Sequence, residues 1–134
     1  MTIRGECFCG SIRYSIDGGL RNARSCHCSR CRKAFSSQAS TYAEVHSDDF
    51  KWDQGEELLS TYESQEGFGL QFCSVCGSTL CGIFDGKVHG VTLGCLLDDP
   101  KIEIGMHIFV GSKASWEIIS GEVLQFEEGV PADN

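Results

Sequence analysis

Three cysteines lie within six residues of one another, at Cys26, Cys28 and Cys31. Their spacing joins a C-x-C step to a C-x-x-C step, and a tight turn over such a segment can direct all three sulfurs at one ion. Zinc is the metal that thiolates of this kind typically hold, about 2.3 Å from each sulfur in tetrahedral geometry. Three thiolates leave the fourth position open, as in catalytic zinc sites. A dense cysteine cluster is more often a structural zinc site than a catalytic one, so the spacing alone leaves both interpretations open.

Two other segments each supply a pair of thiols. Cys7 and Cys9 form a second C-x-C step, and Cys73 and Cys76 form a C-x-x-C step that is followed by Gly77. A glycine after the second thiolate relieves the turn of a zinc knuckle. Neither pair completes a tetrahedron alone, but together they make a closed four-thiolate site. Such a site would close a loop of more than sixty residues and stabilise the fold through chain entropy.

Two cysteines remain outside this partition. Cys81 is a possible fourth ligand for the cluster of Cys26, Cys28 and Cys31. Cys95 belongs to an apolar segment and is expected to be a small buried hydrophobic side chain.

The charged side chains are unevenly distributed. The formal net charge of −8 argues against general nucleic-acid binding, because such proteins rely on Lys and Arg to displace counterions from phosphate. Residues 1–33 nevertheless carry seven of the eleven basic side chains and two acidic ones, a local charge of +5. Arg30, Arg32 and Lys33 belong to the cysteine-rich segment itself and are candidates for binding a small anionic substrate. The alternative for each is an ordinary solvated side chain.

The ligand chemistry of the three-thiol cluster favours one class of reaction. Three thiolates donate so much charge that zinc among them activates water weakly, which argues against hydrolysis. Soft ligands suit an added thiol, which coordination deprotonates near neutral pH and presents as a nucleophile. An electrophilic carbonyl carbon is the natural partner of such a nucleophile. The residues therefore predict addition of a small anionic thiol to an aldehyde, or the reverse carbon–sulfur cleavage.

The segments that must position these thiols have the pattern of short strands. Ile12, Tyr14 and Ile16 alternate with polar residues, and Asp85-Gly86 is a strong hairpin signal. Strands are predicted over residues 11–16, 38–45, 50–52, 58–63, 67–72, 87–95, 102–110 and 122–126, with a short helix over 29–35. The sequence thus predicts an all-β fold of short antiparallel strands, pinned by metal and with minimal helix.

The length of 134 residues fits one domain over residues 1–134, with an acidic tail over 127–134 that is expected to be frayed. No apolar run has the length of a signal peptide or a membrane span. An odd count of nine cysteines favours thiols and metal ligands over disulfides. We therefore expect a cytoplasmic protein without a membrane partner.

Five motifs follow one another over nearly the whole chain. They are Gly5-x-Cys7-x-Cys9-Gly10-x-x-Arg13-Tyr14, Cys26-His27-Cys28-x-x-Cys31-Arg32-Lys33, Phe72-Cys73-x-x-Cys76-Gly77-Ser78-x-Leu80, Asp98-Asp99-Pro100 and His107-Ile108-Phe109-Val110-x-Ser112-Lys113-Ala114-x-Trp116. This series resembles the glutathione-dependent formaldehyde-activating enzyme family, to which centromere protein V is related.

The resemblance implies a β-tent fold and two zinc ions per chain, of which the second is expected to be more easily lost. It also implies S-(hydroxymethyl)glutathione synthase activity, which is a carbon–sulfur lyase activity in reverse, with glutathione and formaldehyde as substrates. The implied ligands are Cys7, Cys9, Cys73 and Cys76 for a structural ion, and Cys26, Cys28 and Cys31 for a catalytic one. The alternative is a non-catalytic zinc-binding, thiol-binding or redox-responsive module.

Two histidines belong to these motifs. His27 lies between two predicted ligands, so we expect its side chain to point away from the metal and to act at most on the ligands' surroundings. His107 is expected to be a hydrogen-bonded structural residue rather than a ligand.

Overall fold

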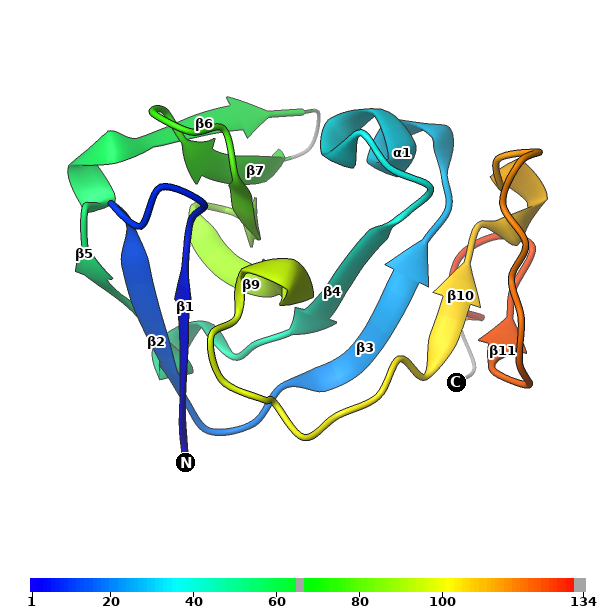
Figure 1. The fold of residues 1–134 in the computed structure, drawn as a ribbon, viewed down its shortest axis with the longest axis horizontal. Coiled ribbons are helices and arrows are strands. Elements are labelled where there is room, and N and C mark those ends of the chain that lie inside the picture. Colours follow the sequence, from blue (N-terminus) through cyan, green and yellow to red (C-terminus); the bar gives the residue numbers. More distant parts are fainter. Residues whose placement is uncertain (65–66, 132–134) are drawn as a thin grey trace. The chain divides into compact units, whose positions relative to one another are not determined.

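The computed structural model describes residues 1–64 and 67–131. Strands make up most of its regular structure, and within these ranges α1 (Ser29–Phe35) is the only α-helix (Figure 1). The predicted all-β class with minimal helix is confirmed. The backbone groups into two compact units, called here the first unit (residues 1–21 and 43–102) and the second unit (residues 22–42 and 103 onward). A single domain over residues 1–134 stays a prediction.

One sheet of the first unit has the strand order β1-β2-β5, with both pairs antiparallel. Its strands are β1 (Thr2–Glu6), β2 (Arg13–Asp17) and β5 (Phe50–Gln54). Tyr14 and Ile16 are buried, and the ring of Tyr14 stacks on Phe50 with ring centroids 5.1 Å apart. Burial of such side chains contributes about 1.5–3 kcal/mol each and fixes the register of the sheet.

A second group of strands in the first unit is a meander of successive antiparallel neighbours. It contains β6 (Leu59–Glu63), β7 (Phe68–Cys73), β8 (Thr79–Phe84) and β9 (Lys87–Thr92). Asp85 and Gly86 connect β8 to β9 with φ angles of 49° and 78°, the left-handed conformation that a two-residue hairpin turn requires. The hairpin predicted from Asp85-Gly86 is confirmed. This meander places the turn after β7 at the end of a paired strand.

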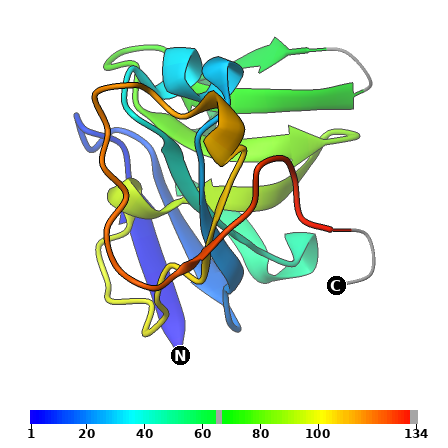
Figure 2. The same cartoon turned by 90° about the vertical axis from the view of Figure 1, so that its right-hand side faces the viewer.

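The second unit is built around β3 (Arg21–Cys26), which pairs with β10 (Met106–Ile108). β10 runs parallel to β3 and also parallel to β11 (Leu124–Gln125), so this part departs from the predicted antiparallel pattern. Figure 2 shows the long connection from β10 to β11 that a parallel pair needs. β4 (Ser40–Glu44) follows α1 and leads the chain back into the first unit.

One prediction about the C-terminal third needs correction. The strand predicted over residues 102–110 forms only as β10 and ends before Phe109, because the left-handed φ angle of 55° at Phe109 interrupts extended backbone. The amides of Phe109 and Gly111 donate to the carbonyls of Glu128 and Glu127 at the start of the tail, and fraying of the tail stays a prediction. The tail's last residues, 132–134, lie outside the described residues.

Candidate metal centres

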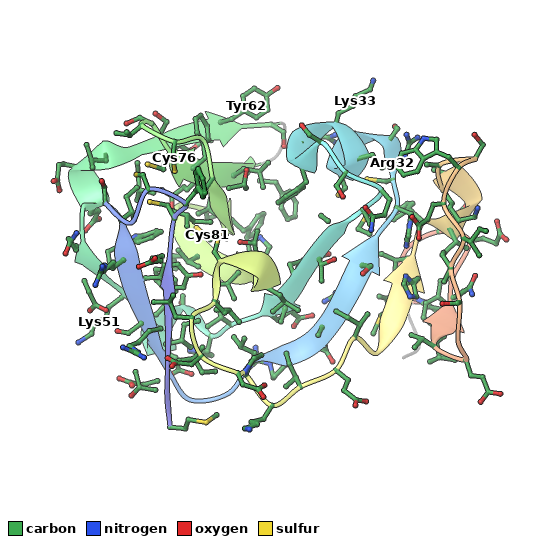
Figure 3. All side chains as sticks on the ribbon, in the orientation of Figure 1. Arg32, Lys33, Lys51, Tyr62, Cys76 and Cys81 are labelled. Carbon is green, nitrogen blue, oxygen red and sulfur yellow. The ribbon has the colours of Figure 1, made fainter. Side chains whose placement is uncertain are left out.

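The first cluster brings together the four thiols that the sequence pairs across the chain. Cys7 and Cys9 lie in the turn after β1; Cys73 is the last residue of β7, and Cys76, labelled in Figure 3, lies in the turn that follows. The Sγ atoms of Cys7 and Cys9 are 3.6 Å apart, those of Cys9 and Cys73 are 3.9 Å apart, and all four lie within 4.8 Å of one another. Tetrahedral zinc with bonds of about 2.3 Å places its sulfur ligands about 3.8 Å apart. The cluster therefore has the geometry of a closed four-thiolate site.

Local backbone hydrogen bonds shape the two turns of this cluster. The amide of Ile12 donates to Cys7 Sγ at 3.3 Å, and the amide of Cys76 donates to Cys73 Sγ at 3.5 Å. Gly10 and Gly77 have φ angles of 78° and 82°, and their amides donate to the carbonyls of Cys7 and Cys73. Glycine is favoured at such positive φ angles, which explains the glycine after each thiol pair.

The thiols of the first cluster differ in acidity. Burial raises the pKa of Cys7 to about 11. Burial acts to raise the pKa of Cys76, but hydrogen bonds from Ser78, Cys9 and Cys73 together outweigh it and lower that pKa to about 5. A bound metal would favour the deprotonated form of every ligand, so its binding releases protons from the buried thiols.

The second cluster consists of Cys26, Cys28 and Cys31, with their Sγ atoms within 4.8 Å of one another. Cys26 ends β3, Cys28 is the N-cap of α1, and Cys31 lies in the first turn of that helix. The side chain of Cys28 accepts a hydrogen bond from the amide of Cys31 at 3.3 Å, as an N-cap residue does. The helix thus begins directly after the thiol of Cys28, and its first turn brings the third sulfur to the other two.

One thiol of the second cluster is readily deprotonated. A hydrogen bond from Cys26 lowers the pKa of Cys31 to about 6 against the opposing effect of burial, and the charge of Arg30 lowers it further. The same interaction raises the pKa of Cys26, with burial adding to the rise. The cluster therefore stabilises one thiolate even before a metal joins it.

The two remaining cysteines have partners of their own. The thiol of Cys81 in β8 is buried and donates to Gln71 Oε1 at 3.4 Å, and burial raises its pKa to about 12. Cys95 donates to the carbonyl of Thr79 at 3.7 Å. Neither belongs to a group of thiols with metal-ligand spacing among the described residues.

The two histidines of the motifs contact each other within the second unit. His27 Nε2 and His107 Nδ1 are 2.9 Å apart and share a hydrogen bond, and the side chain of His27 is buried. The amide of His27 also donates to the carbonyl of Ile108 at 2.9 Å, which extends the pairing of β3 with β10 into the ligand segment. Burial and the neighbouring His107 lower the pKa of His27. β10 thus holds the segment between two ligand thiols by both backbone and side chain.

The basic residues of the cysteine-rich segment lie on α1. Arg30 is exposed in the first turn. Arg32 and Lys33, labelled in Figure 3, line a surface pocket of about 260 Å³ together with Ser36, Ser37 and Trp116. Arg30 does not line this pocket.

Other features bear on the class of protein. Within the described residues, no helix has the length and apolar character to cross a bilayer. The structure combines an all-β frame with two clusters of thiols whose spacing could hold metal ions. Residues 2–112 match the family model of the glutathione-dependent formaldehyde-activating enzyme, and the chain belongs to this family.

The comparisons with other proteins add support for the fold. A crystal structure of a Rhodobacter sphaeroides protein is similar, with 24% sequence identity and a TM-score of 0.56. The match covers 73% of this chain and 91% of that one. No curated protein matches.

Proposed function

We propose that this protein is a zinc-dependent carbon–sulfur lyase that joins glutathione, or a similar small thiol, to formaldehyde or a related aldehyde. The observation that carries the proposal is the difference between the two clusters. The first offers four thiols in tetrahedral spacing, and the second offers three with no fourth thiol, imidazole or carboxylate grouped with them in residues 1–64 and 67–131. The choice of glutathione as the thiol and formaldehyde as the aldehyde is supported by the family to which the chain belongs.

The donor sets fit two zinc ions with different roles. Cys7, Cys9, Cys73 and Cys76 would hold a structural ion, and Cys26, Cys28 and Cys31 would hold the catalytic one less tightly. The catalytic ion, when bound, would lower the pKa of a substrate thiol and so favour its thiolate at neutral pH.

The chain's own residues position the second cluster and attract its substrate. α1 fixes Cys28 and Cys31, and the hydrogen bond between His27 and His107 holds the segment that carries the thiols. We propose that Arg30, Arg32 and Lys33 attract the anionic thiol, because a cationic segment on an acidic protein steers small anions.

The proposed reaction is balanced without a further reactant. In the synthetic direction the thiol sulfur bonds to the carbonyl carbon, and the proton that the thiol loses ends on the former carbonyl oxygen. In the reverse direction the carbon–sulfur bond breaks, and the hydroxyl proton returns to the sulfur. The thiols require a reducing environment, so we propose a cytoplasmic location.

NMR exchange spectroscopy tests the proposal by measuring the rate at which glutathione and formaldehyde interconvert with their adduct. Zinc-loaded protein should accelerate this exchange over the uncatalysed rate, and Cys31→Ser should remove the acceleration. Cys95→Ser is the matched control, because it removes a thiol outside both clusters and should leave the rate unchanged. An uncatalysed rate with the wild-type protein, or full acceleration by Cys31→Ser, contradicts the proposal.

A redox-responsive module, in which Cys26, Cys28 and Cys31 sense oxidants, is a second candidate, favoured by the hydrogen bond from Cys26 that lowers the pKa of Cys31 to about 6. It predicts that mild peroxide releases zinc while the protein leaves the exchange rate at its uncatalysed value.

A further inference from the structure

The pocket beside α1 has an unusual lining for an acidic protein. Of its five lining residues, Arg32 and Lys33 are cationic, Ser36 and Ser37 carry hydroxyls, and none is acidic. The fifth, Trp116, is 68% exposed, although it is the largest apolar side chain type. An exposed indole ring beside two cations is typical of a surface that binds a ligand with an anionic end and an apolar body.

The charge in this pocket is uncompensated. Neither Arg32 nor Lys33 forms an ion pair with a carboxylate anywhere in the described parts of the chain. Nε of Arg32 is buried and lacks a hydrogen-bond partner there, so the stem of the side chain is held in the protein while its charge has no counterion. An arginine held in this way is suited to bind a carboxylate with two parallel hydrogen bonds.

We propose that this pocket binds the C-terminal carboxylate of a peptide thiol, so that Arg32 and Trp116 select glutathione over thiols that lack this group. The proposal rests on the proposed function, which places the substrate sulfur at the second cluster. It assigns one group of the substrate, the C-terminal carboxylate, to this pocket, whereas the proposed function invoked only a general attraction of anions by the basic residues.

The reach of a tripeptide agrees with this assignment. Arg32 directly follows Cys31 in α1, and the helix rises about 1.5 Å per residue, so the pocket begins within one helical turn of the thiols. The thiol of glutathione is on its middle residue, so about two residues, or about 7 Å of extended chain, separate it from the glycine carboxylate, which places that carboxylate within reach of the pocket.

The chemistry of glutathione also distinguishes its two ends. Its γ-glutamyl end carries an ammonium group beside the carboxylate, and this charge is repelled by two cations. Its glycine end carries the carboxylate alone. A doubly cationic pocket with no acidic lining residue therefore favours the glycine end.

Isothermal titration calorimetry on the zinc-loaded protein tests the assignment with two ligands, glutathione and glutathione amide. The amide replaces the glycine carboxylate with a neutral group of nearly the same shape. We expect the wild-type protein to bind glutathione about 10- to 100-fold more tightly than the amide, the range for a hydrogen bond to a charged group. Arg32→Gln should bring this ratio close to one. Arg21→Gln, which removes the same charge at the exposed start of β3, should keep the ratio of the wild type.

Three results would overturn the assignment: a wild-type ratio close to one, a full ratio in Arg32→Gln, or no glutathione binding by the wild type. If Arg32→Gln does not fold, Lys33→Gln takes its place, and the assignment then requires a reduced ratio in that variant. The exchange rate of the formaldehyde adduct separates this assignment from the proposed function. If the protein binds glutathione more tightly than the amide but does not accelerate the exchange, the pocket assignment stands and the proposed enzyme function fails. If it binds both thiols equally and accelerates the exchange with both, the enzyme function stands and the pocket assignment fails.

Discussion

The division of the thiols into two sites predicts that Cys76→Ser and Cys31→Ser lower the stability of the zinc-loaded protein by different amounts. Cys76 belongs to a cluster that joins the turn after β1 to the turn after β7. Cys31 belongs to a cluster whose members all lie within one short segment. Removing a ligand from either weakens a crosslink, and the loss depends on the length of the loop that the crosslink closes.

The loop lengths give the magnitude of the difference. Cys9 and Cys73 are 64 positions apart, and a crosslink over such a loop contributes about 4 kcal/mol in the chain-entropy picture. The segment from Cys26 to Cys31 closes a loop of five positions, for which the same relation gives about 2 kcal/mol. A loss of about 1 kcal/mol lowers the melting temperature of a domain of this size by about 4 °C. Loss of the crosslink of about 4 kcal/mol should therefore make Cys76→Ser melt on the order of 15 °C below the wild type, a large effect for a total stability of about 5–15 kcal/mol.

Urea unfolding followed by circular dichroism measures both losses, with Cys95→Ser as the control that removes a thiol outside the clusters. A strong chelator should lower the stability of the wild type by at least as much as Cys76→Ser does, since it removes the crosslinks of both clusters. Equal losses in Cys76→Ser and Cys31→Ser, or a larger loss in Cys31→Ser, would refute the division into a structural and a catalytic site.

Three further predictions concern the first unit. Gly5→Ala should lower the free energy of unfolding by about 1–3 kcal/mol, because the added methyl group would overlap the ring of Tyr14. Gly19→Ala meets no atom within 4 Å and should have little effect in the same urea titration, so equal losses would argue against this packing. Tyr14→Phe should raise the free energy of unfolding by about 1 kcal/mol, because the buried hydroxyl of Tyr14 has no hydrogen-bond partner among the described residues; a loss of stability would contradict this. Hydrogen bonds from Arg4 lower the pKa of Asp98 to about 2, so their stabilising effect is complete above about pH 4 and is lost as the pH falls through 2. Asp98→Asn should therefore remove part of the acid sensitivity in that pH range, and an unchanged acid titration would show that the pair does not contribute.

The features that the sequence predicted correctly depend on local spacing. The helix over Ser29–Phe35 follows from residues within one segment. The grouping of Cys7 and Cys9 with Cys73 and Cys76 is the exception, because it joins distant segments and follows from ligand number; the role of these thiols as zinc ligands stays a prediction. The hairpin at Asp85-Gly86 follows from the φ angles that these residue types tolerate.

The features that the sequence did not predict depend on contacts between distant segments. His27 and His107 are 80 positions apart, and nothing in the spacing of either histidine indicates the other as its partner. Trp116 reaches the pocket with Arg32 only because β10 pairs in parallel with β3. The strand predicted over residues 102–110 was too long, because an alternating pattern does not show that Phe109 adopts a left-handed conformation.

A zinc titration of the metal-free protein tests the central claim most directly, with the unfolding midpoint and the rate of glutathione–formaldehyde exchange measured at each step. The closed four-thiolate site should fill first, because it supplies one more ligand than the cluster of Cys26, Cys28 and Cys31. The first equivalent should therefore raise the midpoint with little catalysis, and the second should bring the acceleration of exchange. Full catalysis with the first equivalent, or no acceleration after the second, would contradict the assignment of a structural zinc to one cluster and a catalytic zinc to the other.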